Sequence, residues 1–291
     1  MKHSSLIPTF GYAVGLGGND SGTAFAPLIM QNSPFLNSSP VKLLWKHIFY
    51  IKQSAPKLAA LPAIAEACTK LAEAVRAATQ QKKRFLVVGG DHTSGIGTWS
   101  GASTALSKRG DFGLIWLDAH LDSHTPKTTP SNNIHGMSLA VLLGYGDPLL
   151  KSILHASQKL KPQNLCIVGV RSYEPEELAF LNKLGVKIYY MDDIRKRGIN
   201  QILAEAIEHV SKNTVGFGVS IDIDLFDPKD APGVGVPEPQ GISTKQFLKE
   251  CSVLSQNAHF IGLEIVEFNP MLDQKQKTER LVAALIQTIF L

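Results

Sequence analysis

The chain has 291 residues, of which 44% are hydrophobic and 19% charged, so it can bury a sizeable core. The net charge is +4, and the 29 basic residues are scattered along the chain, which argues against a nucleic-acid-binding surface. No apolar run approaches the roughly 18 residues of a membrane span. The N-terminus, interrupted by Pro8 and Gly11, lacks the clean apolar region of a signal peptide. We therefore predict one cytoplasmic domain over residues 1–291, without a membrane partner and with three reduced cysteines, Cys68, Cys166 and Cys251.

Short apolar runs alternate with segments of helical pattern along the chain. We predict strands at Thr9–Leu16, Arg84–Gly89, Phe112–Asp118, Asn164–Val170, Val186–Met191, Val215–Asp222 and His259–Ile265. We predict helices at Pro56–Gln80, Ile199–Lys212, Ser243–Ser255 and Lys275–Phe290, with Ser243 as an N-cap and Gln246 three residues later. Runs such as FLVV and LIWL are apolar on both faces, which is typical of a parallel sheet covered by helices. The pattern predicts an α/β protein, a three-layer α/β/α sandwich around a central, mostly parallel β-sheet.

Polar side chains follow the predicted strands, at the edge where such sheets bind ligands. The segment WLDAHLDSH is polar at every second position, so we expect Asp118, His120, Asp122 and His124 to point to one face for as long as the strand stays extended. The segment SIDID repeats that spacing. Carboxylates and imidazoles in such a row are costly to bury unless a cation lies among them. We predict two divalent ions, with manganese favoured by the oxygen-rich donor set, held by His92, Asp118, His120, Asp122, Asp222 and Asp224.

A dinucleotide site is the main competing interpretation. Gly95, Gly97 and Gly101 follow a strand and open a helix, with Asp118 about 20 residues on, as in the nucleotide fingerprint. The third glycine is one place late, however, and a small-residue helix packed closely on the sheet explains the pattern better. Such an oxidoreductase would purify with cofactor absorbance and no metal. A binding protein that had lost activity would be expected to lack a ligand, and none is missing.

The ordered motifs GGDH, DAHxD, a loop ending NxHG, SxDxDxxDP and ExxExNP span about residues 85–270. This order resembles the arginase–agmatinase (ureohydrolase) family. The resemblance implies a binuclear manganese centre, with Co²⁺ or Ni²⁺ as other possible metals, in which a metal-bridging hydroxide hydrolyses a guanidino group and releases urea. It also implies a homo-oligomer, either a trimer or a hexamer. The roles implied are proton shuttling for His135, guanidinium binding for Glu267, and proton transfer to the leaving amine for the ligand Asp122.

The loop TPKTTPSNNIHG resembles the TPxTTxSGNxHG loop of arginases, whose polar residues hold the substrate carboxylate and α-amino group. The resemblance implies a substrate-binding set of His124, Thr129, Ser131, Asn133 and Glu174, and hydrolysis of L-arginine to L-ornithine and urea. Three positions depart from the usual arginase residues: His124 for asparagine, Asn132 for glycine and Val236 for threonine. An agmatinase, or another guanidino- or formimidoyl-amino-acid hydrolase of the family, is therefore the alternative.

Overall fold

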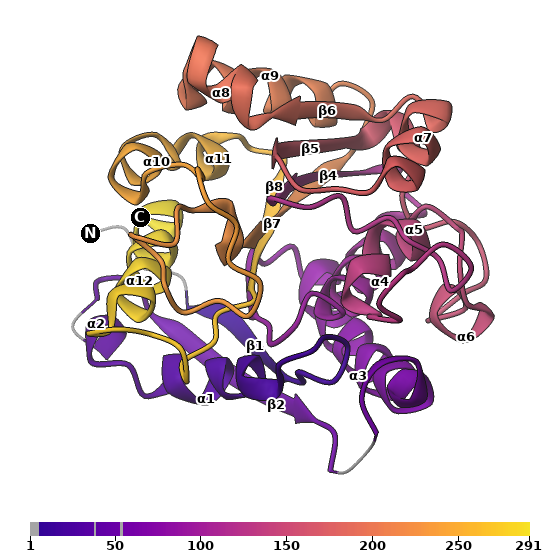
Figure 1. Cartoon of the computed structure of the whole chain (residues 1–291), viewed down its shortest axis with the longest axis horizontal. Helices are drawn as coiled ribbons and strands as arrows, with labels where there is room; N and C mark the ends of the chain where they lie inside the picture. Colours follow the sequence, from indigo (N-terminus) through magenta and orange to yellow (C-terminus); the bar gives the residue numbers. More distant parts are fainter. Residues whose placement is uncertain (1–5, 38, 53–54) are drawn as a thin grey trace.

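The structure is a computed structural model that describes residues 6–37, 39–52 and 55–291. Its centre is an all-parallel sheet in the order β2-β1-β3-β8-β7-β4-β5-β6, seen edge-on in Figure 1. The strands are β1 (Ile7–Ala13), β2 (Leu43–Tyr50), β3 (Phe85–Val88), β4 (Phe112–Leu117), β5 (Leu165–Val170), β6 (Lys187–Tyr190), β7 (Gly216–Asp222) and β8 (Phe260–Val266). The predicted fold class is confirmed.

Helices cover both faces of the sheet (Figure 1). The α-helices are α1 (Ala26–Gln31), α2 (Pro34–Asn37), α3 (Leu61–Gln80), α4 (Ser94–Leu106), α5 (Ser138–Leu142), α6 (Pro148–Lys151), α7 (Pro175–Leu184), α8 (Met191–Arg197), α9 (Ile199–Ser211), α10 (Thr244–Glu250), α11 (Val253–Gln256) and α12 (Lys277–Phe290). The 3₁₀ helices are η1 (Ser21–Phe25), η2 (Lys57–Ala60), η3 (His135–Met137), η4 (Pro162–Asn164) and η5 (Ile223–Leu225).

Two apolar cores fill the spaces between sheet and helices. One lies under α1, α2 and α8 to α12, and the other under α3 to α7. Successive strand residues point to opposite cores, as β3 shows: Leu86 and Val88 belong to the first core, and Phe85 and Val87 to the second. Burial on both faces explains why these strands read as continuous apolar runs.

The glycine-rich segment that suggested a dinucleotide site is the helix α4 itself. Gly97 and Gly101 face α3, where an added Cβ would lie 2.7 Å from the carbonyl oxygen of Cys68 and 2.3 Å from that of Ala72. The glycines therefore allow two helices to pack closely, and they form no phosphate-binding turn ahead of a helix. The small-residue interpretation is the correct one.

The structure departs from the predicted elements in three places. The edge strand β2 was not predicted, and the helices expected at 56–80 and 243–255 each divide in two, as η2 with α3 and as α10 with α11. Ser243 occupies the N-cap position, but its hydroxyl makes no capping hydrogen bond. Instead, Asp230 Oδ2 accepts a hydrogen bond of 3.1 Å from the Thr244 amide. Cys68, Cys166 and Cys251 are free thiols. Within the described residues, no helix is long and apolar enough to span a membrane.

Candidate metal centre and substrate pocket

Five neighbouring strands, β3-β8-β7-β4-β5, present their carboxyl ends at one edge of the sheet. The residues predicted to form the site come from the segments at or just beyond these ends, although they lie far apart in sequence. In sheet order they are His92 after β3, Glu267 after β8, Asp222 and Asp224 from β7 and η5, Asp118, His120 and Asp122 after β4, and Glu174 after β5.

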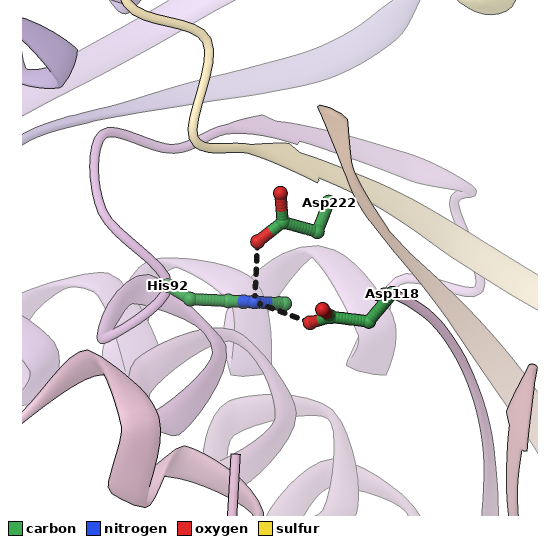
Figure 2. Close-up of side chains that lie close together, drawn as sticks. All are labelled: His92, Asp118 and Asp222. Carbon is green, nitrogen blue, oxygen red and sulfur yellow. Dashed lines mark ion pairs between the residues drawn. The ribbon is translucent and has the colours of Figure 1, made fainter. Parts of the chain in front are cut away.

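The first cluster surrounds the imidazole of His92, which is 1% exposed. Its Nδ1 atom lies 3.2 Å from Asp118 Oδ2, 3.0 Å from Asp122 Oδ2 and 3.1 Å from Asp222 Oδ2. Figure 2 shows the carboxylates of Asp118 and Asp222 pointing at this nitrogen from two sides. The ring stacks on Trp116, with centroids 3.9 Å apart, which fixes its plane.

The donors of this first cluster fit a divalent cation. Although three carboxylate oxygens lie close, His92 Nδ1 forms no hydrogen bond with any described group, so the nitrogen and the oxygens converge with no hydrogen between them. Burial lowers the pKa of His92, but the three carboxylates outweigh it and raise that pKa well above its usual value. The same negative field favours a metal ion, and imidazole with carboxylates suits a hard or borderline metal such as Mn²⁺.

The second cluster shares Asp118 with the first. His120 Nδ1 lies 2.8 Å from Asp224 Oδ2 and 3.5 Å from Asp118 Oδ1. Burial acts to raise the pKa of Asp118, yet the two flanking imidazoles hold it below its usual range. Burial and the neighbouring carboxylates raise the pKa of Asp222. Two ligand clusters joined by one carboxylate are the arrangement expected of a binuclear site.

The predicted reason for this convergence was wrong. β4 ends at Leu117, and Asp122 has a φ of 45°, so the row Asp118, His120, Asp122 follows a curling loop and not an extended strand. Asp224 lies in the turn η5, where its amide donates to Asp222 Oδ1 at 2.9 Å. Tight local turns, stabilised by such hydrogen bonds, bring the carboxylates together.

A buried relay sets the orientation of His92. Its Nε2 lies 3.0 Å from Ser220 Oγ, which donates at 2.8 Å to Glu264 Oε2. Because the serine hydroxyl gives its proton to the carboxylate, it accepts one from His92 Nε2. The imidazole therefore carries its proton on Nε2 and leaves Nδ1 free to act as a ligand.

His135 and Glu267 lie beside the first cluster. Glu267 Oε1 is 2.9 Å from His135 Nδ1 and accepts a hydrogen bond of 2.8 Å from the His92 amide. Burial lowers the pKa of His135, but the charge and hydrogen bond of Glu267 outweigh it and raise that pKa to about 9. Divalent ions nearby would oppose this effect, because they add positive charge.

The predicted substrate residues line one cavity of about 200 Å³ above the ligands. Its walls include His124, Thr129, Ser131, Asn133 and Glu174, together with His135, Glu267 and Val236. The structure thus brings the whole predicted set together, whereas His92 and Asp118 lie below the cavity floor. Ser131 Oγ accepts a hydrogen bond of 3.2 Å from the Asn133 backbone amide, and Thr129 Oγ1 accepts one of 3.0 Å from the Asn132 backbone amide. The loop is therefore stabilised by its own side chains.

His124 is paired with acidic groups. Its Nε2 lies 3.1 Å from Glu174 Oε2 and 3.4 Å from Glu177 Oε2, and together the three residues form a third group of possible metal ligands. Burial, with a hydrogen bond to Glu174, raises the pKa of Glu177 to about 8. This wall of the cavity is therefore acidic as well as polar.

Sequence reasoning missed three carboxylates of the site. Glu177 is buried in the cavity wall, and Glu238 Oε1 lies 3.5 Å from His120 Nε2. Asp91, the aspartate of the GGDH motif, is buried, and burial with the charge of Glu267 raises its pKa to about 6. Glu177 stands at the third position of α7, where a capping glutamate is ordinary. No local sequence pattern distinguishes these carboxylates from ordinary ones, because their place in the site depends on contacts between loops that are distant in sequence.

Comparisons with known proteins agree with this geometry. The sequence profile of the arginase family matches residues 10–291. The arginase of Bacillus caldovelox is 39% identical over 239 residues, which are 82% of this chain and 79% of the relative. Its solved structure superposes with a TM-score of 0.91 at 34% identity, covering 98% of both chains. The formimidoylglutamase of Bacillus subtilis has a TM-score of 0.79 at 23% identity, covering 100% of this chain and 88% of the other, which shows a shared fold alone.

Proposed function

Since the chain belongs to the arginase family of ureohydrolases, we propose that it hydrolyses the guanidino group of L-arginine to give L-ornithine and urea. The observation that supports this most directly is the pair of ligand clusters joined at Asp118, at the floor of a cavity lined by a polar loop. The six proposed ligands are His92, Asp118, His120, Asp122, Asp222 and Asp224. Two Mn²⁺ ions are the favoured occupants, and Co²⁺ or Ni²⁺ would suit the same donors.

Two divalent ions held there would acidify water and so supply a nucleophile near neutral pH. Glu267, 8% exposed, faces the cavity and would hold the substrate guanidinium by charge-assisted hydrogen bonds. Water adds to the guanidinium carbon, the bond to the side-chain nitrogen breaks, and that nitrogen needs a proton. Asp122 is the proposed carrier of this proton, and His135 the relay between the site and solvent.

The α-carboxylate of arginine would be bound by the loop residues Thr129, Ser131 and Asn133. Their hydroxyl and amide groups line the cavity, and a carboxylate can accept several hydrogen bonds at once. Glu174, another residue of the cavity lining, would attract the α-ammonium group. A substrate with both groups satisfies both sets of residues, whereas agmatine lacks the carboxylate and α-ammonium at that end.

A second candidate is a related guanidino- or formimidoyl-amino-acid hydrolase. It is favoured by His124, an imidazole in the cavity lining where arginases have asparagine, and by Val236, which is 38% exposed and offers no hydroxyl near the proposed guanidinium position. Family resemblance further suggests a homo-oligomer acting on a small guanidino substrate.

The test is a urea-release assay with Mn²⁺-loaded protein on L-arginine, agmatine and guanidino acids in parallel. We expect arginine to exceed agmatine in kcat/KM by roughly 10⁴-fold, because polar groups built to bind an absent partner stay unpaired. Ser131→Ala should narrow this gap mainly by weakening arginine. A higher kcat/KM for agmatine or a guanidino acid in the wild type would refute the arginine assignment and leave the ureohydrolase chemistry intact.

A further inference from the structure

Asp91 is a buried carboxylate to which the proposed reaction assigns no role in binding metal or substrate or in transferring protons. It is 1% exposed and precedes the ligand His92, but it belongs to neither metal cluster among the described residues. Its Oδ1 accepts hydrogen bonds from the Thr93 amide at 3.1 Å and from the Thr93 hydroxyl. Its Oδ2 accepts one from the Gly17 amide at 2.7 Å. The bond from Gly17 reaches across 74 residues to the loop that follows β1.

That loop, residues 14–18, is attached to the segment carrying His135. The carbonyl oxygen of Gly17 accepts hydrogen bonds from the amides of Ile134 at 2.7 Å and His135 at 3.2 Å. Residue Asp91 anchors the loop a second time, because its own amide donates to Val14 at 2.8 Å. Hydrogen bonds thus link the Asp91 carboxylate to the backbone of His135 through a single residue, Gly17, whose N–H donates to Asp91 and whose C=O accepts from His135.

The loop also lies against the imidazole ring. A Cβ added to Gly18 would stand 3.2 Å from His135 Cε1 and 3.4 Å from Nε2, so the absence of a side chain leaves room for the ring. A Cβ on Gly17 would meet Thr93 Cγ2 at 2.6 Å and Asp91 Oδ2 at 3.0 Å. The imidazole is therefore enclosed between this loop and Glu267, whose Oε1 holds its Nδ1 at 2.9 Å.

We propose that Asp91 and the loop 14–18 position His135 for proton transfer, so that Asp91 is a positioning residue acting through Gly17. This rests on the proposed shuttle function of His135. Without the Asp91 carboxylate, the Gly17 peptide loses its anchor, and His135 loses the fixed carbonyl that holds its amide. A misplacement of about 1 Å can cost about 10²-fold in rate, so anchoring at this distance matters.

A double-mutant cycle separates positioning from a general structural role. Asp91→Asn keeps the size of the side chain. Its NH₂ group, however, takes the place of the carboxylate oxygen that accepts the hydrogen bond from the Gly17 backbone N–H. We expect it to lower kcat for arginine by about 10–100-fold with wild-type His135, and by less than about twofold in a His135→Ala background. Bound manganese, measured by elemental analysis, should stay at the wild-type level, and KM should change little.

Gly18→Ala provides an independent arm that leaves Asp91 intact. Its methyl group would crowd the imidazole, so it should lower kcat in the wild type and be tolerated in His135→Ala, where the space is open. Asp20→Asn is the matched control, because Asp20 caps the neighbouring turn by accepting the Gly22 amide at 2.8 Å and has no link to His135. It should leave kcat unchanged in both backgrounds.

Equal losses from Asp91→Asn in both backgrounds, or loss of manganese in that variant, would overturn the inference and make Asp91 a structural support of the metal centre. A His135→Ala enzyme with wild-type kcat would instead remove the shuttle role itself, and the inference with it. The two failures are distinguishable, because the second is visible in the single His135 variant.

Discussion

Replacing Glu264 with glutamine should loosen the metal centre from a distance. Glu264 is fully buried and belongs to none of the ligand clusters formed by the described residues. It accepts hydrogen bonds from Ser94 at 2.9 Å, Thr98 at 2.6 Å, Trp99 at 3.0 Å and Ser220 at 2.8 Å. Because it only accepts, it forces the Ser220 hydroxyl to donate and leaves His92 Nε2 as the donor of the relay. Glutamine has a donor NH₂ group in place of one carboxylate oxygen, so the Ser220 hydroxyl no longer has to donate to residue 264.

The magnitude follows from the number of bonds. A hydrogen bond to a charged acceptor is worth about 1.5–3 kcal/mol and a neutral one about 0.5–1.5, so weakening four of them should lower the free energy of unfolding by roughly 4–6 kcal/mol. Loss of an outer partner of a ligating histidine typically costs about 10–100-fold in metal affinity. We expect Glu264→Gln to show both effects.

The assay is the rate and extent of manganese loss to a competing chelator, with urea unfolding measured on the same samples. Ser220→Ala should reproduce the loss of metal affinity, since it cuts the same relay. Glu279→Gln is the matched control: Glu279 is also buried, at 6% exposure, but it lies on α12 in the opposite layer. Metal affinity within twofold of wild type in both Glu264→Gln and Ser220→Ala would refute the argument that the relay fixes the His92 tautomer.

Three further predictions concern the ligands, the pH response and the packing. The wild type should bind two manganese ions per chain by elemental analysis, and Asp122→Asn should bind less metal with severely reduced activity; full activity at one ion would contradict the binuclear site. In metal-free protein, the pair of His135 with Glu267 raises the His135 pKa to about 9, so its stabilisation is complete below the unfolded value near 6.5 and disappears as the pH rises through 9. The difference in urea stability between wild type and His135→Ala should accordingly fall by roughly 3 kcal/mol across that range, and a constant difference would exclude the pair as its source. Gly218→Ala should destabilise by roughly 3 kcal/mol or more, because the new Cβ would lie 2.0 Å from Trp99 Cζ3; unchanged urea unfolding would show that the core yields there.

The sequence predicted the class of fold well, because buried parallel strands leave a plain signature. FLVV and LIWL are apolar at every position, and each became a central strand, β3 and β4. The strand β2 escaped prediction because its sequence LLWKHIFY lies at the sheet edge, where Lys46 and His47 face solvent and interrupt the apolar run.

The site was predicted in composition but not in construction. Asp118, His120 and Asp122 were expected to align by strand alternation, whereas a positive φ at Asp122 turns the chain within the loop. A period of two in sequence cannot reveal such a turn. Glu177 and Asp91 were not predicted as site residues for a related reason. Their neighbours in space, His124 and Gly17, come from distant segments, and a single sequence does not indicate which distant segments meet.

The order of strands has a consequence for biosynthesis. β3 and β4, which immediately precede the segments of His92 and Asp118, are separated in the sheet by β8 and β7, which are synthesised later than all the other strands described. Until residues 216–266 have emerged, the early strands lack their central partners and two edges stay open to incorrect pairing. Asp222 and Asp224 are synthesised with β7 and η5, so a nascent chain that still lacks these elements cannot form either ligand cluster. We therefore expect metal capture to follow the synthesis of β7 and η5, and ribosome-bound intermediates to depend on chaperones that shield the open edges.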